Sequence, residues 1–309
     1  MQEKWTKSIN RLFFMMVLSV MVVPLPLAGV LANLNTEWLL VVSQLLYLVP
    51  VLIYIAVKRI RPWEWMPFTK IPLSAFLMLL LFSVLLLPLV IFINLISMLF
   101  VTNQVADMST GLTNNSFWLN LLLFAVMPAV SEEFMFRGIF YHAYRKKGVW
   151  MGALACGIVF ALLHLNFNQF SYALVLGVIF CLVVEATGSI FGSMTVHFMV
   201  NGWNVVLIAL QKPMEEMAQS LEGQAQSVTL TEEQLLISLG VYGVFALIAT
   251  VLAACALVWI AKRCGRQEHM KWCFTRHEAI PGEKKTFLTP CWIAGFCICI
   301  GYMLLNELL

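Results

Sequence analysis

Charged residues are scarce in this sequence. Asp, Glu, Lys and Arg make up 11% of its 309 residues and 61% are hydrophobic, whereas soluble domains contain roughly 25% charged residues. A soluble fold of this length has too little polar surface to cover so much apolar material. Hydrophilic stretches long enough to fold by themselves are also missing. We therefore expect a single membrane domain over residues 1–309.

Several short motifs are absent as well. The eight cysteines form no C-x-x-C pair, which argues against a zinc ribbon or a disulfide framework. No H-E-x-x-H helix presents two zinc ligands on one face. We find no internal repeat and no basic, aromatic surface of the kind that binds nucleic acid. The partner that we predict for the chain's surface is the lipid bilayer, with no nucleic acid.

Long apolar runs are what the sequence has in abundance. A helix of about 20 apolar residues crosses a bilayer, and helices are the only open-ended structures that satisfy backbone hydrogen bonds in lipid. We predict an all-α polytopic bundle of about nine spans. The runs cover residues 12–32, 38–57, 72–101, 117–144, 149–165, 168–186, 189–211, 234–261 and 288–307.

Lysine and arginine residues predict the orientation of the bundle. They cluster before the first run, after the second, after the fourth and between the last two, while the 212–233 loop is acidic. A cytoplasmic N-terminus then places every basic cluster on the cytoplasmic side, as the positive-inside rule requires. The pattern favours a bacterial plasma membrane and does not exclude an endoplasmic reticulum. A cleavable signal peptide is the weaker interpretation of the first run, because the run is long.

A few charged and polar residues interrupt the apolar runs. A charge at the centre of a span costs about 2.5–3.5 kcal/mol on insertion scales, and such residues usually mark function. Three of the charges fall within residues 131–137. The interrupting residues are Glu132, Glu133, Arg137 and Glu185, together with His164, His197 and Asn201.

The 131–137 segment separates its two carboxylates. On a helix, Glu133 and Arg137 are i,i+4 neighbours that can pair. Glu132 points roughly 100° away, so one carboxylate is neutralised while the other stays free for chemistry. Pro128 removes a backbone donor just upstream, and we expect it to bend the helix.

Three expected helices bring this chemistry to a similar depth. At 1.5 Å per residue, Glu132 and His164 lie about 20 Å from the cytoplasmic side and Asn201 about 18 Å, with His197 one turn away on the same face as Asn201. A carboxylate and an imidazole can deprotonate water, and a second imidazole with an amide can stabilise an oxyanion. Each group alone is typical of a buried ion pair or an interhelical hydrogen bond. Their combination favours hydrolysis of an amide bond.

Three ordered motifs carry a family resemblance. Glu-Glu-x-x-x-Arg at 132–137, Phe-x-x-x-His at 160–164 and His-x-x-x-Asn at 197–201 follow one another on successive expected helices. This order resembles the CAAX protease and bacteriocin-processing family of intramembrane proteases, which includes the type II CAAX prenyl endopeptidases. The resemblance covers residues 118–205, and no motif position departs from the pattern.

The resemblance implies a role for each motif residue. Glu132 would be the general base and would act with His164 on the attacking water. His197 and Asn201 would form the oxyanion site. The residues that would support the architecture of the site are Glu133, Arg137 and Phe160.

Two mechanisms are known for the family that the sequence resembles, one with a metal ion and one without. We favour the metal-free, glutamate-dependent mechanism and expect no cofactor, since the H-E-x-x-H helix is absent. If zinc is bound, its ligands would be Glu132, His164 and His197.

The function predicted from the sequence is that of an intramembrane endopeptidase. Its substrate would be a membrane-associated peptide, either a prenylated tail or a bacteriocin-type precursor. The alternative is a non-catalytic membrane scaffold or regulator of the bacteriocin-immunity type. A proton-coupled transporter is less favoured because no inverted repeat is visible.

Two features near the basic side lie outside this prediction. We expect Glu185 and His142 at the membrane interface. The last basic loop carries cysteines and histidines between residues 264 and 277, whose spacing matches no familiar zinc module. We interpret that loop as a membrane-facing basic segment.

Overall fold

The computed structural model describes residues 2–101, 115–222, 232–275 and 287–308. Every regular element in these ranges is a helix, which confirms the predicted all-α class. The elements are α1 (Gln2–Val22), α2 (Pro24–Leu31), α3 (Thr36–Lys58), α4 (Pro62–Trp65), α5 (Leu73–Ser97), α7 (Phe117–Leu121), η1 (Leu122–Val126), α8 (Met127–Glu133), η2 (Phe134–Tyr141), α9 (His142–Tyr144), η3 (Arg145–Lys147), α10 (Val149–Leu162), α11 (Phe167–Thr187), α12 (Ile190–Glu222), α13 (Glu232–Arg263), α14 (Gln267–Phe274) and α15 (Pro290–Leu308).

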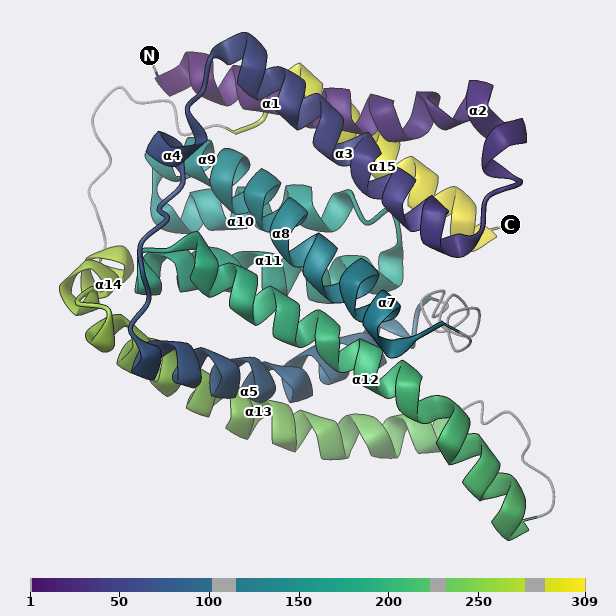
Figure 1. Ribbon diagram of the computed structural model, residues 1–309. Coiled ribbons are helices and arrows are strands. Elements are labelled where there is room, and N and C mark those ends of the chain that lie inside the picture. Colours follow the sequence, from purple (N-terminus) through teal and green to yellow (C-terminus); the bar gives the residue numbers. More distant parts are fainter. Residues whose placement is uncertain (1, 102–114, 223–231, 276–286, 309) are drawn as a thin grey trace.

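The helices form three layers (Figure 1). One outer layer holds α1, α3 and α15, which pack on one another, and the other holds α5 and α13. The helices from α8 to α12 lie between them. The largest buried cluster gathers around η2 and α10, so the residues of the candidate site lie on the central, best-packed helices.

The number of membrane spans differs from the predicted nine. Seven helices in the described ranges are long and apolar enough to cross a bilayer, or eight if α1 and α2, bent by 41°, form one span. Pro24 begins α2 and lacks the donor that would continue α1. The run at 149–165 contains only the 14 residues of α10, about 21 Å of helix against a hydrocarbon core of about 30 Å.

The span Phe117–Lys147 is one continuous helical segment with two π-helical stretches. These stretches, η1 and η2, flank α8, the turn that carries Glu132 and Glu133. Pro128 lies in the first turn of α8, and η1 widens the helix just before it. A π-helical register absorbs the missing donor locally, so Pro128 produces no break of the kind seen between α1 and α2.

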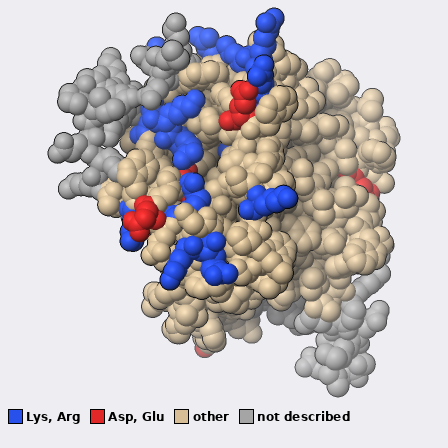
Figure 2. Space-filling view, turned by 60° about the vertical axis from the view of Figure 1, so that its left-hand side comes forward, with Lys and Arg blue, Asp and Glu red and all other residues tan. Residues whose placement is uncertain are grey.

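The basic clusters meet at one end of the bundle. Figure 2 shows lysine and arginine side chains spread over the end where α4, α9 and α14 lie. Lys146 lies over the rings of Trp5 and Trp65, while Arg145 and Arg266 both reach Glu185. Most side chains of the acidic 212–233 loop lie outside the described residues. The gathering of the clusters agrees with the predicted topology, and the assignment of this end to the cytoplasm stays a prediction.

Two glycines let α10 and α11 approach closely. A Cβ atom on Gly177 would lie 2.8 Å from the Cα atom of Gly157. Small residues at such crossings are the usual device for close helix packing in membranes. The approach brings the Gly177 carbonyl within 3.1 Å of Arg137 Nη2, which joins α11 to the candidate site.

Candidate active site

Glu133 is the most deeply buried carboxylate of the 131–137 segment. Its Oε1 atom accepts hydrogen bonds from Arg137 Nη1 at 2.7 Å and from His197 Nδ1 at 2.9 Å. The side chains of Glu133 and Arg137 are both fully buried. The i,i+4 pair expected from the sequence is therefore present, and it also binds a histidine from α12.

Aromatic rings enclose the guanidinium group of Arg137. Its Cζ atom lies 4.6 Å from the ring centre of Phe160 and 4.9 Å from that of Phe180. Both distances are within the range of cation–π attraction. These rings and the Gly177 carbonyl surround the guanidinium group, while Glu133 Oε2 and Arg137 Nε have no hydrogen-bond partner among the described residues.

Glu132 is in a different situation. Its side chain is 15% exposed, against 0% for Glu133. The Oε1 atom accepts a hydrogen bond from Gln44 Nε2 at 2.9 Å, and the Oε2 atom lies 3.8 Å from His197 Nε2. The two ring nitrogens of His197 thus face two consecutive glutamates, and only one of these carboxylates is partly accessible.

His164 follows the end of α10 and lies near the same group. Its Nδ1 atom is 2.8 Å from the Phe160 carbonyl oxygen, which fixes Nδ1–H as the donor and leaves the Nε2 lone pair available. The Phe160 ring is 4.8 Å from the His164 ring and 6.1 Å from the His197 ring. The two imidazoles therefore lie around one phenylalanine.

Asn201 is half-buried one turn beyond His197 on α12. It shares the helix face of His197 because it is four residues further on. We find no hydrogen-bond partner for it in the part of the chain that the structure describes, so the part of Asn201 in the site stays a prediction.

Sequence reasoning missed the contribution of α3. Gln44 binds Glu132, and Ser131 Oγ lies 2.8 Å from Gln44 Oε1 and 2.8 Å from the Met127 carbonyl oxygen. One helical turn further on, the Tyr47 hydroxyl donates to the Leu163 carbonyl. The one sequence signal that could have found Gln44 is that it is an uncharged amide in the middle of an apolar run.

The three residues predicted to bind zinc, if zinc is bound, do not form a complete ligand set. Glu132 Oε2 and His197 Nε2 are 3.8 Å apart, a separation that suits two ligands of one ion. Among the described residues, three possible ligand atoms lie within 4.8 Å of one another in a different group, which consists of Glu185, His269 and Cys273. Because His164 does not complete the set, we derive no catalytic step through a metal.

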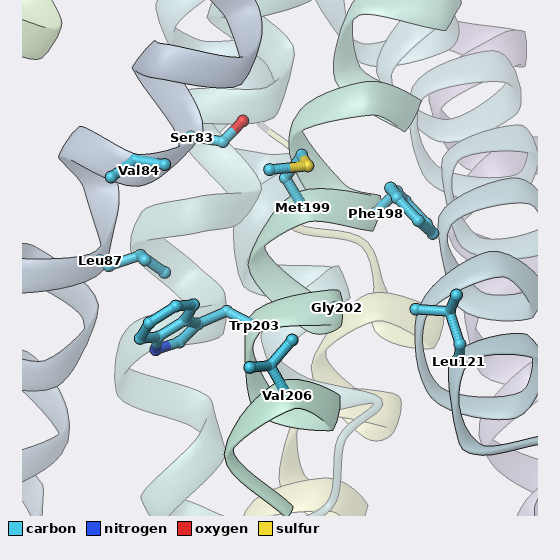
Figure 3. Close-up of a pocket in the computed structure, with 9 residues that line it drawn as sticks. All are labelled: Ser83, Val84, Leu87, Leu121, Phe198, Met199, Gly202, Trp203 and Val206. Atoms are coloured by element: carbon cyan, nitrogen blue, oxygen red, sulfur yellow. The ribbon is translucent and has the colours of Figure 1, made fainter. Parts of the chain in front are cut away.

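An apolar groove runs along the neighbouring face of α12. It has a volume of about 200 Å³, and Figure 3 shows side chains from α5, α7 and α12 around it. Phe198 and Gly202, which follow His197 and Asn201 in sequence, form part of its wall. The residues that line it are Ser83, Val84, Leu87, Leu121, Phe198, Met199, Gly202, Trp203 and Val206.

Comparison with known proteins locates this geometry in a family. Residues 114–203 match the family model of type II CAAX prenyl endopeptidase Rce1-like proteins. This segment is Rce1-like. It contains the ordered motifs from Glu132 to Asn201, so the resemblance expected over 118–205 is confirmed. Neither a curated protein nor a solved structure matches the chain.

The Rce1-like family is a protease family, and the apolar helices described above make the chain a multi-pass membrane protein. The match covers less than a third of the 309 residues. Gln44 and Tyr47 lie outside it, on α3. The Rce1-like segment therefore supplies the motifs, while a helix from outside the segment contacts them.

Glu185 belongs to the Rce1-like segment but lies at the basic end. It accepts hydrogen bonds from the Tyr141 hydroxyl at 2.8 Å and from Arg145 Nη2 at 2.9 Å. His269 Nε2 lies 2.6 Å away and Arg266 Nη2 lies 3.6 Å away. Glu185 is 1% exposed because cations from two other segments cover it, and its predicted place at the membrane interface stays a prediction.

α14 is fixed to the bundle through Glu185. Its Cys273 thiol lies 3.5 Å from His269 Nε2, and burial together with the Glu185 charge raises the pKa of Cys273 to about 11. A neutral thiol is a poor metal ligand, and two arginines already neutralise Glu185. We therefore regard this cluster as a structural anchor for the loop between α13 and α15.

Proposed function

We propose that the chain is an intramembrane endopeptidase that hydrolyses a peptide bond of a membrane-associated substrate. The observation that carries the proposal is the asymmetry between consecutive glutamates. Glu133 is fully buried and pairs with Arg137 and His197, whereas Glu132 is 15% exposed and has the neutral amide of Gln44 as its hydrogen-bond donor. A partly accessible carboxylate beside two imidazoles is the arrangement that general-base hydrolysis needs.

The proposed reaction begins with a water molecule held between Glu132 and the Nε2 lone pair of His164. Glu132 accepts the proton as the water oxygen attacks the scissile carbonyl. The proton then passes to the departing amine, which completes hydrolysis without a covalent intermediate. Supporting this assignment, His164 Nδ1 is committed to the Phe160 carbonyl, so its other nitrogen is an acceptor.

Stabilisation of the oxyanion falls to His197 and Asn201. His197 Nδ1–H donates to Glu133, so donation from Nε2 requires the doubly protonated imidazolium form. Asn201 offers an amide N–H from the same helix face, and two donors aimed at a developing oxyanion are the usual minimum for such a site.

The proposed substrate class follows from the surroundings of α12. The apolar groove in Figure 3 lies next to the helix face that carries His197. Such a wall suits a peptide that carries a prenyl group or an apolar segment and reaches the site from the membrane. A prenylated C-terminal tail and a bacteriocin-type precursor both have this chemistry, and the bilayer would present either one.

The test is hydrolysis by the purified full-length protein in lipid nanodiscs. Wild type, Glu132→Ala and the exposed control Glu64→Ala are each incubated with a library of prenylated and unmodified membrane peptides, and the products are identified by mass spectrometry. We expect fragments from wild type and Glu64→Ala but none from Glu132→Ala. Equal cleavage by Glu132→Ala would overturn the proposal, and a cellular phenotype that survives this substitution would favour the scaffold.

A further inference from the structure

The helix α3 contributes to the candidate site although it lies outside the Rce1-like segment 114–203. Gln44 and Tyr47 are three residues apart and therefore share one helix face. That face bonds twice to the core: Gln44 reaches the side chain of Glu132, and Tyr47 reaches the backbone next to His164. One face of α3 thus contacts Glu132 itself and the residue that precedes His164.

The amide of Gln44 is held in one orientation. Ser131 Oγ lies 2.8 Å from Gln44 Oε1 and 2.8 Å from the Met127 carbonyl oxygen, so its one hydrogen is shared between these two acceptors. The Nε2 group then points to Glu132 Oε1 at 2.9 Å. Ser131 is the residue before Glu132, so the segment that carries the carboxylate also orients the amide that binds it.

This contact makes the two oxygens of Glu132 unequal. Oε1 is occupied by the amide N–H, while Oε2 faces His197 at 3.8 Å. A hydrogen bond to an ionised carboxylate is about twice as strong as one between neutral groups. Within a low-dielectric bundle it restrains rotation of the carboxylate, which keeps Oε2 directed to the space where a water and a scissile carbonyl would meet.

We propose that Gln44 is a positioning residue for the hydrolysis: it fixes the carboxylate of Glu132 so that a single oxygen serves as the base. The inference rests on the proposed function and deepens it. It also gives α3 a part in catalysis. Gln44 acts through Glu132 and does not itself touch the reacting atoms.

The experiment measures kcat and KM for the full-length protein in nanodiscs, with the peptide that the preceding library identifies. Gln44→Met keeps the length of the side chain and removes its N–H donor. Loss of one hydrogen bond to a charged group predicts a fall in kcat of about 10-fold to 100-fold. KM should stay within about twofold, since the lost interaction orients the base and binds no substrate. Leu45→Met, on the lipid-facing side of the same helix, is the matched control and should keep wild-type kcat.

A structural role alone would not reproduce the coupling between Gln44 and Ser131. We expect Ser131→Ala to lower kcat less than Gln44→Met does, and the double variant to be no worse than Gln44→Met, because Ser131 acts by orienting the amide. Gln44→His retains an N–H donor and should recover part of the lost kcat. Thermal unfolding of each variant, compared with Leu45→Met, separates loss of fold from loss of positioning.

The outcomes distinguish the two proposals. If Glu132→Ala is inactive while Gln44→Met keeps wild-type kcat, the positioning role is refuted and the proposed function stands. If Glu132→Ala still cleaves the peptide, the proposed function fails first. Strictly additive losses for Gln44→Met and Ser131→Ala would also refute the positioning role.

Discussion

Two glutamate clusters lie in the same bundle, and their surroundings differ. At the candidate site, Glu133 is neutralised but Glu132 keeps an accessible oxygen. At the basic end, Glu185 is met by a tyrosine, two arginines and a histidine. Both clusters place a carboxylate among apolar helices, so burial of charge alone does not distinguish a site from an anchor.

The number of hydrogen-bond and ion-pair partners on the carboxylate oxygens distinguishes the candidate site from the anchor. Glu185 has cationic or hydroxyl partners on both oxygens. Its carboxylate could therefore accept a proton or bind a water molecule only by losing one of these hydrogen bonds. Glu132 has one partner and an imidazole nearby. An unsaturated carboxylate costs free energy in a low-dielectric interior, and such a cost is expected to persist where function requires it.

The largest expected effect is on catalysis at Glu132. Glu132→Gln keeps the shape and the contact with Gln44 but removes the base, so kcat should fall by about 10²-fold to 10⁴-fold. Peptide cleavage in nanodiscs measures this fall. Glu185→Gln is the paired variant and should keep kcat within about threefold, which is under 1 kcal/mol. Equal losses in the two variants would erase the distinction between site and anchor.

The next effect is on folding at Arg137. Arg137→Met leaves the fully buried Glu133 carboxylate without its main counter-charge. Breaking a buried ion pair by removing one partner costs roughly 3–5 kcal/mol. Thermal unfolding in detergent should show a large drop in midpoint temperature. A midpoint within one or two degrees of wild type would mean that Glu133 is not held as an ion pair.

A smaller stability effect is expected at the anchor. Glu185→Gln removes the charge that Arg145 and Arg266 share, but both arginines are about one-third exposed and water can hydrate them. We expect a loss of about 1–2 kcal/mol, with faster proteolysis of the loop between α13 and α15. Limited proteolysis of wild type and variant side by side checks this, and an unchanged cleavage rate would show that α14 is held by other contacts.

The smallest expected effect concerns the Cys273 thiol. Its pKa of about 11 means that the unreactive neutral form dominates at pH 8, and alkylation by iodoacetamide should accelerate as the pH rises toward that value. Glu185→Gln removes a negative charge that raises this pKa, so alkylation at pH 8 should accelerate by less than about tenfold. Mass spectrometry of the Cys273 peptide measures the rate. A slower rate in the variant would contradict the contact.

The spacing of residues within single helices predicted much of the candidate site. The pairing of Glu133 with Arg137 follows from the i,i+4 rule, which needs no tertiary information. Consecutive residues of a helix point roughly 100° apart, so the sequence also predicted that Glu132 stays free while Glu133 is neutralised. By contrast, Gln44 and Glu132 are 88 residues apart in the sequence and meet because two helices pack together. No rule of local spacing predicts such a contact.

The number of membrane spans shows a limit of prediction from hydropathy. The run at 149–165 is apolar enough to suggest a membrane helix, but α10 ends at Leu162, before the turn that holds His164. Hydropathy measures the solvent preference of a segment and not the length of its helix. The same limit applies to Glu185, whose neighbours Arg266 and His269 come from a separate segment.

The sequence by itself determined the membrane environment, the all-α class, the ordered motifs and the pairing within one helix turn, because composition and helical periodicity are properties of local chain. Only the tertiary structure decided which groups surround Glu185, which helix contacts Glu132 and how α14 is anchored. These outcomes depend on contacts between distant segments. Their free energies arise from the geometry of packed helices, which sets how many partners each carboxylate has.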